Sequence, residues 1–345
     1  MASEQEGLCP QSPGPGCDHD HAFGGQAVIE GVMMRGKRSW SVAVRRPSGG
    51  IERVSFALPA ASERNSFYKL PVVRGVVALL ESLSLGIKAL GISANIGLEE
   101  AAAAGSGTGD DEAVDTLSGT EDTPQKPPYQ FGWKELAGTI VFSLVLAVAL
   151  FVAVPLVVVK HFETTFHNPF IFNLVEGLIR IAIFLIYIGV ISFIPDLRRV
   201  FQYHGAEHKV IHAYEHCESL DPEHAGRFKT MHPRCGTGFL LLVMVVAVFV
   251  FALVGKPSVP WLILSRVVGI PVIVGIAYEI GIKWAGRHVD SLVPRIIMWP
   301  GIQLQRLTTR EPTDAQLEVA AAALLEVMRK DEAEEAAGLT ALAGA

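Results

Sequence analysis

The residues best suited to chemistry lie in one short stretch, 203–237. It holds six of the protein's 11 histidines and two of its four cysteines, Cys217 and Cys235. Imidazole nitrogens and thiolates are common protein ligands of Zn²⁺. Long apolar segments lie on both sides of this stretch. We therefore start from the hypothesis of a metal site beside a membrane.

The first half of the stretch predicts a helix with one metal-binding face. At about 100° per residue, His208 and Glu215 lie within roughly 40° of His204. The pattern H-x-x-E-H formed by His204, Glu207 and His208 is that of the inverted zincins, in which the glutamate acts as general base. The sequence predicts His204 and His208 as ligands of one divalent metal, Glu215 as a further ligand and Glu207 as the base.

The second half of the stretch ends in His232-Pro-Arg-Cys235, just before an apolar segment. A catalytic zinc site needs three protein ligands and an open position for water, and either His232 or Cys235 supplies the third. Arg234 is expected to anchor a phosphate or carboxylate of a substrate. Two alternatives stay open: Cys235 is simply a small buried residue, or the whole histidine face touches lipid headgroups and binds no metal.

The composition indicates a membrane protein. Half of the residues are hydrophobic, and the mean hydropathy is +0.36. A helix needs about 20 apolar residues to cross a bilayer. Four segments approach that length and predict a mainly α-helical, polytopic bundle of about four transmembrane helices: 136–159, 172–194, 238–254 and 261–282.

Loop charges set the expected orientation. The segment 195–236 carries six Lys and Arg residues, whereas 160–171 and 255–260 carry one each. Because basic loops stay on the cytoplasmic side, we expect a multi-pass membrane protein with both termini and the histidine-rich loop in the cytoplasm. Short basic runs beside apolar segments do not form a nucleic-acid-binding patch.

The rest of the chain divides by composition. A hairpin signal around Pro47–Gly50 predicts a small cytoplasmic β unit, and an apolar stretch with regularly spaced charges predicts an amphipathic, membrane-associated helix. The expected units are a disordered tail 1–22, the β unit 23–60, the helix 70–98, a disordered acidic linker 101–128, a membrane domain 136–284 containing the histidine-rich loop 195–236, and a cytoplasmic segment and helix 285–330.

Four charged residues fall inside the expected spans: Glu176, Arg180, Arg266 and Glu279. Charges in lipid are costly and should face the bundle interior. Glu176 and Arg180, four residues apart, are expected to pair on their own helix. Glu279 is a candidate carboxylate for the histidine site, or one half of an interhelical pair.

Five blocks together resemble the bacterial YqhQ-type membrane proteins: GGQAVIEGVMMRG, FQYHGAEHKVIHAYE, HPRCGTGFLL, RVVGIPVIVGIAYEIGIKWAGR and PGIQLQRLTTREPTDAQLEVA. The resemblance covers most of residues 23–328. It implies a location in the bacterial inner (plasma) membrane and a family of predicted metal-dependent enzymes. It also supports treating the histidine stretch, from His204 to Cys235, as one unit.

The function expected from these observations is metal-dependent, zinc-type hydrolysis of a peptide or lipid-linked bond at the cytoplasmic membrane face. Membrane lipids are the expected partners, and homo-oligomerisation stays open. Two alternatives belong to other classes: an ion or small-solute transporter or channel, and a non-enzymatic membrane scaffold. The sequence does not name the substrate.

Overall fold

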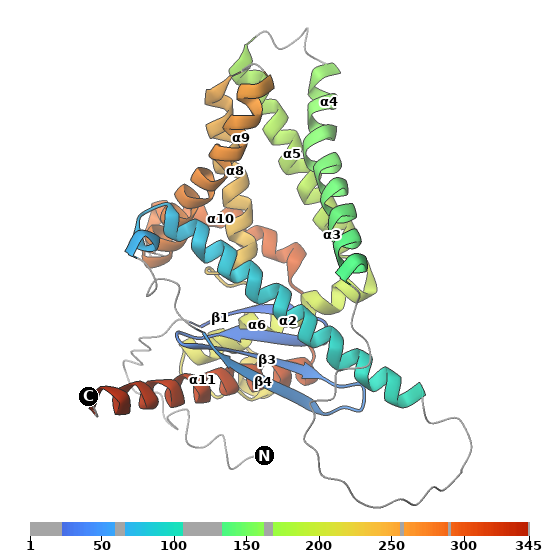
Figure 1. The fold of residues 1–345 in the computed structure, drawn as a ribbon, viewed down its shortest axis with the longest axis vertical. Coiled ribbons are helices and arrows are strands. Elements are labelled where there is room, and N and C mark those ends of the chain that lie inside the picture. The colour runs from blue at the N-terminus through green and yellow to red at the C-terminus, as the bar shows by residue number, and fades with distance from the viewer. Residues whose placement is uncertain are drawn as a thin grey trace, which may run out of the picture.

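The computed structural model describes residues 23–58, 66–105, 133–161, 168–255, 259–288 and 291–343. The chain is mainly helical and carries one small sheet. In Figure 1 the sheet and the helices packed on it lie below a bundle of apolar helices. The predicted tail 1–22 and most of the predicted linker, 106–128, lie outside the described residues.

The predicted β unit is confirmed as a four-stranded antiparallel meander. Its strands are β1 (Gly24–Val28), β2 (Gly31–Arg35), β3 (Ser39–Arg45) and β4 (Ile51–Ala57). The predicted hairpin joins β3 to β4, where Arg45 pairs with Ile51.

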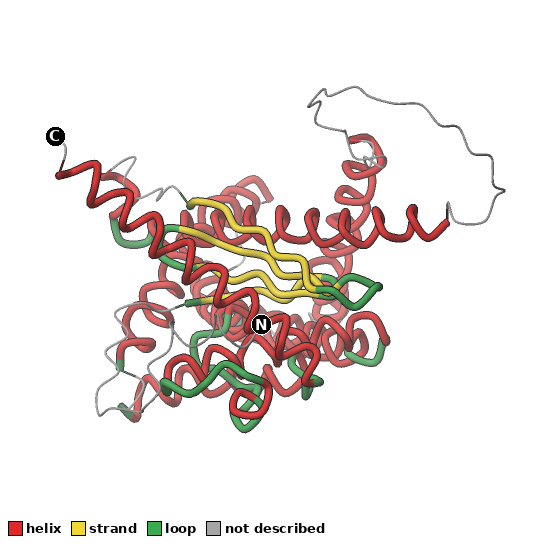
Figure 2. The backbone as a smooth tube through the Cα atoms, turned by 90° about the horizontal axis from the view of Figure 1, so that it is seen from below, coloured by secondary structure: helices red, strands yellow, loops and turns green. Residues whose placement is uncertain are grey.

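Side chains of the sheet alternate between two hydrophobic layers, as the two-residue period of a strand requires. Val32, Met34 and Ala43 pack toward α6 (Pro195–Glu215) and α11 (Asp314–Ala343). Met33, Trp40, Val42 and Val44 point the other way and meet Leu85, Ala89 and Ile96 of α2 (Val73–Gly105). Seen from below, α11 crosses the strands obliquely (Figure 2). The sheet is therefore covered on both faces.

Helix α2 is longer than predicted. It runs on through residues 101–105, which had been assigned to the linker. The reason is the Ala101–Ala104 run, because alanine has the highest helix propensity. The stretch Val73–Glu99 is long and apolar enough to cross a membrane, yet one face of it packs on the sheet, and Figure 1 shows it lying obliquely between the sheet and the apolar helices.

Helix α11 begins as predicted from its capping box. The backbone N–H of Thr313 donates to Oε1 of Gln316 at 2.9 Å, which satisfies an otherwise unpaired group at the helix start. The buried hydroxyl of Ser41 on β3 donates to the carbonyl of Ala323 at 2.7 Å. The helix continues to Ala343, past the expected end at 330.

Three of the predicted spans are found among the four described helices that are long and apolar enough to cross a membrane. These are Val141–His161, Pro169–Ile191 and Gly236–Val254. The first belongs to a continuous rod of α3 (Trp133–Val148), the π-helix η2 (Ala149–Ala153) and α4 (Val154–His161); the others are α5 (Pro169–Ile191) and α8 (Gly236–Val254). These helices are compatible with a membrane protein.

The fourth predicted span, 261–282, is helical throughout but irregular, and it is not among the four helices that meet the length and hydropathy criteria within the described residues. α9 (Val259–Ala277) contains Pro271 and passes into the π-helix η3 (Tyr278–Trp284) and the short 3-10 helix η4 (Ala285–Arg287). Pro271 removes one backbone hydrogen bond inside α9. α10 (Leu292–Thr308) follows.

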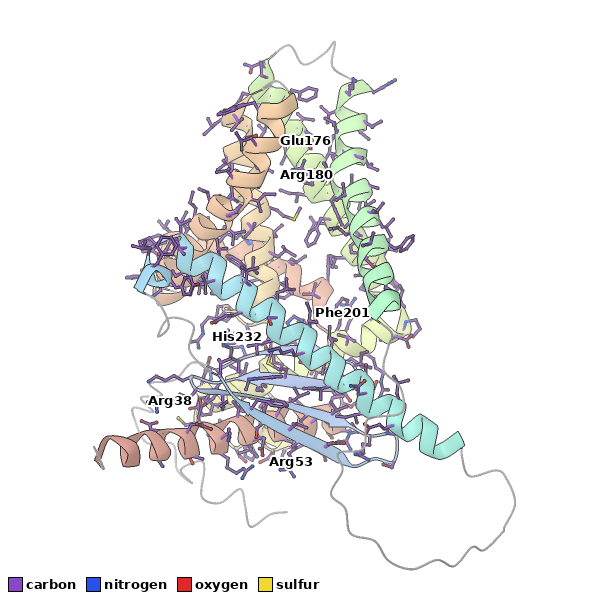
Figure 3. The ribbon with its side chains drawn as sticks, viewed as in Figure 1. Arg38, Arg53, Glu176, Arg180, Phe201 and His232 are labelled. Atoms are coloured by element: carbon purple, nitrogen blue, oxygen red, sulfur yellow. The ribbon has the colours of Figure 1, made fainter. Side chains whose placement is uncertain are left out.

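Of the four charged residues predicted to fall inside the spans, the three whose side chains are described form ion pairs. Arg180 pairs with Glu176 as predicted and also donates to the carbonyl of Phe151 in η2 at 2.9 Å. Figure 3 shows this pair high among the apolar helices. Glu279 pairs with Arg74 of α2, so it is an interhelical partner. The side chain of Arg266 is outside the described part of the chain.

Candidate metal centre

Helix α6 fixes the direction in which the histidines point. Pro195 occupies its first turn, where the missing N–H of proline costs nothing. The buried residues of one face, among them Tyr203, Val210 and Tyr214, join the core between α6, α11 and the sheet. The histidines of the opposite face turn toward the segment 230–235 and the end of α10. The amphipathic pattern of the helix therefore aims its imidazoles at this segment.

Gly205 permits the close approach that brings the end of α10 to this face. A Cβ atom at this position would lie 2.1 Å from the carbonyl oxygen of Arg310. The N–H of Arg310 donates to the carbonyl of Phe201 on α6 at 2.9 Å. The same approach sets the Thr308 carbonyl against His204. Glycine is thus needed here for packing.

A buried amide holds the segment that carries the remaining ligands. Oε1 of Gln305 on α10 accepts the backbone N–H of His232 at 2.7 Å, and its Nε2 donates to the His232 carbonyl at 2.8 Å. Gln305 is 1% exposed. Cys235 comes three residues later, immediately before α8. In Figure 3, His232 lies between the sheet and the apolar helices.

Two groups of three potential metal ligands result. In the first, ligand atoms of His204, His208 and Cys235 all lie within 4.8 Å of one another. Nε2 of His204 is 3.2 Å from Sγ of Cys235. Nδ1 of His204 is 2.8 Å from the Thr308 carbonyl, and Nδ1 of His208 is 2.5 Å from the Thr230 carbonyl.

These contacts fit a metal ion. A backbone carbonyl that accepts the Nδ1 proton fixes the tautomer and leaves Nε2 as the ligand atom, as in most protein metal sites. Nε2 of His208 is buried and makes no hydrogen bond within the described residues. A buried polar atom without a partner is costly. A metal bound at Nε2 would remove that cost.

The second group consists of His212, Glu215 and His232, whose ligand atoms also lie within 4.8 Å of one another. Nε2 of His232 is 3.3 Å from Oε2 of Glu215. The other oxygen of Glu215 pairs with Arg234. Each group is therefore linked by a contact between two of its own members, and Glu215 of the second group also pairs with Arg234 outside it.

Glu207 lies one residue before His208 but on the side of α6 that faces the sheet. The carboxylate accepts the backbone N–H of Gly25, and Oε2 is buried with no hydrogen-bond partner among the described residues. Burial raises its pKa to about 7, against the lowering effects of His204 and of the Gly25 N–H. A carboxyl with this pKa exchanges protons readily near neutrality.

Burial also favours the neutral form of His208 and His232. It lowers the pKa of His208, partly offset by the Cys235 thiol. It lowers the pKa of His232 as well, although Glu215 acts in the opposite direction. Neutral imidazole is the form that binds metals.

The structure divides the predicted ligands between two groups. Cys235 is placed with His204 and His208, whereas His232 and Glu215 are placed with His212. His212 was not among the predicted ligands, although its spacing of four from His208 was a usable signal. The carbonyls of Thr230 and Thr308 and the Gln305 amide had no sequence signal, because they are brought together only by packing.

An apolar recess adjoins the first group. Cys235 and Gln305 form part of its wall, together with Pro233 of the loop before α8 and with apolar residues and glycines of α8, η3 and α10: Gly238, Phe239, Leu242, Gly281, Ile282, Ile297, Met298, Gly301 and Ile302. Its empty space, counted together with the solvent at its open side, is about 360 Å³. Among the described residues, no charged side chain lines it. α8 and α10 cross closely here, since a Cβ on Gly301 would lie 2.8 Å from the Cα of Gly238.

Residues 70–330 match the model of a family described as "Protein of unknown function (DUF1385)". The chain belongs to the DUF1385 family. It is 33% identical over 317 residues to the "Uncharacterized protein YqhQ" of Bacillus subtilis strain 168, a match covering 91% of this chain and 94% of that protein. No solved structure matches the chain. The DUF1385 match includes every residue of both ligand groups but leaves out the sheet.

Proposed function

We propose that the protein is a metal-dependent hydrolase acting at the cytoplasmic face of a membrane. The observation that carries this proposal is the convergence of His204, His208 and Cys235, with both imidazoles oriented by backbone carbonyls and a buried Nε2 left free. Two nitrogens and one thiolate are a donor set that suits Zn²⁺. Three protein ligands leave a fourth position for water.

A zinc ion bound there would supply a water of lowered pKa and a Lewis acid for the scissile bond. The chain's own residues would do the rest. Glu207 is the proposed proton acceptor, because its free oxygen is buried and its pKa is raised to about 7, even though His204 acts to lower it. Arg234 is half exposed and tethered to Glu215, so its guanidinium is placed to bind an anionic substrate group in bidentate fashion.

The surroundings of the site favour an amphiphilic substrate. Cys235 immediately precedes α8, a helix apolar enough to cross a membrane, so the first group would lie at the membrane surface. The apolar recess begins at the same cysteine. On α10, Leu292, Val293, Ile296 and Trp299 are exposed. These features favour hydrolysis of a lipid-linked bond rather than of a peptide bond in a soluble substrate.

The first test is elemental analysis of the detergent-purified chain after dialysis against Zn²⁺. Replacing His204 and His208 together by alanine should remove the metal bound with Cys235. His216→Ala is the matched control, because His216 is exposed at the end of the same helix and belongs to neither group. Full metal content in the double variant would refute the assignment.

A second test addresses catalysis. The wild-type chain and Glu207→Gln should be compared on a panel of lipid-linked esters and phosphoesters in mixed micelles. We expect turnover by the wild type and a loss of at least about 100-fold in Glu207→Gln, as for other general bases, with metal content unchanged. Equal turnover in both would remove Glu207 from the mechanism.

A further inference from the structure

We infer that His212, Glu215 and His232 form a second divalent-cation site, so that the centre holds two metal ions side by side. This inference deepens the proposed function and rests on it, because the second site would serve the same reaction.

The two ligand groups are built in the same way from the same two segments. α6 supplies His204 and His208 to the first group and, one turn further on, His212 and Glu215 to the second. The segment before α8 supplies the third ligand in each case, Cys235 to the first and His232 to the second. Two histidines and a glutamate are a known donor set of catalytic zinc.

The spacing within the second group suits a metal ion. Nε2 of His232 and Oε2 of Glu215 are 3.3 Å apart. Two ligands at about 2.0–2.2 Å from a tetrahedral zinc lie about 3.3–3.5 Å from each other. An ion could therefore bridge these two atoms with little movement of either side chain. A hydrogen bond of the usual length would be shorter, about 2.9 Å.

The atoms that would not bind the metal already have orienting partners. Nε2 of His212 is 3.0 Å from the Met231 carbonyl, which leaves Nδ1 as the ligand atom. Oε1 of Glu215 pairs with Arg234, which leaves Oε2. When Nε2 of His232 binds the metal, Nδ1 carries the proton and can no longer accept the backbone N–H of Arg234. That hydrogen bond is weak, because its length is 3.3 Å.

The two sites are neighbours. The ring centroids of His204 and His208 are 4.4 Å apart, those of His208 and His232 are 5.7 Å apart, and those of His232 and His212 are 4.7 Å apart. The four imidazoles thus form one continuous row across both groups. Paired cations stabilise the attacking and leaving oxygens of a displacement, as in many phosphatases. With Arg234 beside them, they favour a phosphate ester as the substrate.

The experiment counts Zn²⁺ ions in the full-length, detergent-purified chain after dialysis, and repeats the loading with Co²⁺. We expect two ions per chain in the wild type and one in His212→Ala/Glu215→Gln. Thiolate-to-cobalt charge transfer should persist in that double variant, since Cys235 belongs to the first site, and disappear in Cys235→Ser. The persisting band also shows that the double variant is folded. His216→Ala should keep both ions.

The other outcomes separate this inference from the proposed function. One ion in the wild type that survives in His212→Ala/Glu215→Gln overturns the second site and leaves the first standing. If the wild type holds one ion and both His212→Ala/Glu215→Gln and His204→Ala/His208→Ala lose it, the two groups form a single shared site. That result overturns the second site. Two ions in His212→Ala/Glu215→Gln place the second ion elsewhere. No bound ion in any form overturns both the second site and the proposed function.

Discussion

Gln305 is the residue whose replacement should most directly show that the loop carrying His232 and Cys235 is held in place. Its side-chain amide is buried, and it pairs with both backbone groups of His232. Gln305→Leu preserves most of the volume but removes both hydrogen bonds. The His232 N–H is then left with no partner among the described residues, while the carbonyl keeps a long contact of 3.4 Å with the Cys235 N–H.

The expected loss of stability follows from the two backbone groups of His232, its N–H and its carbonyl. A buried backbone group without a partner costs about 1–3 kcal/mol, and the carbonyl loses less than the N–H. We therefore expect the free energy of unfolding to fall by about 2–4 kcal/mol. At roughly 2 °C per kcal/mol for a chain of this size, the melting temperature should fall by about 4–8 °C. Metal affinity should fall by about 10–100-fold, as when outer-shell partners of metal ligands are lost.

The assay is thermal unfolding of the metal-free protein in detergent, followed by chelator competition on the metal-loaded protein. Gln303→Leu is the matched control. Gln303 lies on the same helix but outside its buried face, and its side chain is only partly buried. An unchanged melting temperature in Gln305→Leu, or an equal loss in Gln303→Leu, would refute the reasoning that the amide pins the loop.

Three further predictions can be checked on the same preparations. Gly25→Ala should lower the melting temperature and Gly24→Ala should not, because a Cβ on Gly25 would lie 2.8 Å from Cγ of Glu207 whereas Gly24 has open space. Arg180→Ala should destabilise by about 3–5 kcal/mol by leaving Glu176 buried and unpaired, and adding Glu176→Ala should recover much of that loss in unfolding measurements. Removing the metal with a chelator should lower the melting temperature, by an amount that grows with the free metal concentration used for the holoprotein.

The centre also explains why this fold combines a sheet with apolar helices. α6 packs its apolar face on the sheet and α11, while its imidazoles meet segments that lead into α8 and out of α10. The ligands therefore come from both layers of the molecule. Any shift of the sheet layer against the apolar helices would change the distance between His204 on α6 and Cys235 beside α8.

Much of the architecture was determined by the sequence alone. The β-branched runs around Pro47–Gly50 dictated the hairpin of β3 and β4, and the capping box at Thr313 dictated the start of α11. Long apolar segments gave three of the helices able to cross a membrane, and the four-residue spacing of Glu176 and Arg180 gave their ion pair. These features depend on local periodicity and short-range contacts, which a sequence displays directly.

The tertiary structure decided the partners. Helical periodicity put His204, His208, His212 and Glu215 on one face, but it could not divide them into two groups, because that division is made by where the loop from His232 to Cys235 crosses α6. Helical periodicity also could not show that Glu279 forms an ion pair with Arg74, which lies about 200 residues away in the sequence. Backbone carbonyls that orient the imidazoles carry no side-chain signature. Such contacts arise only from how α6, α8 and α10 pack together.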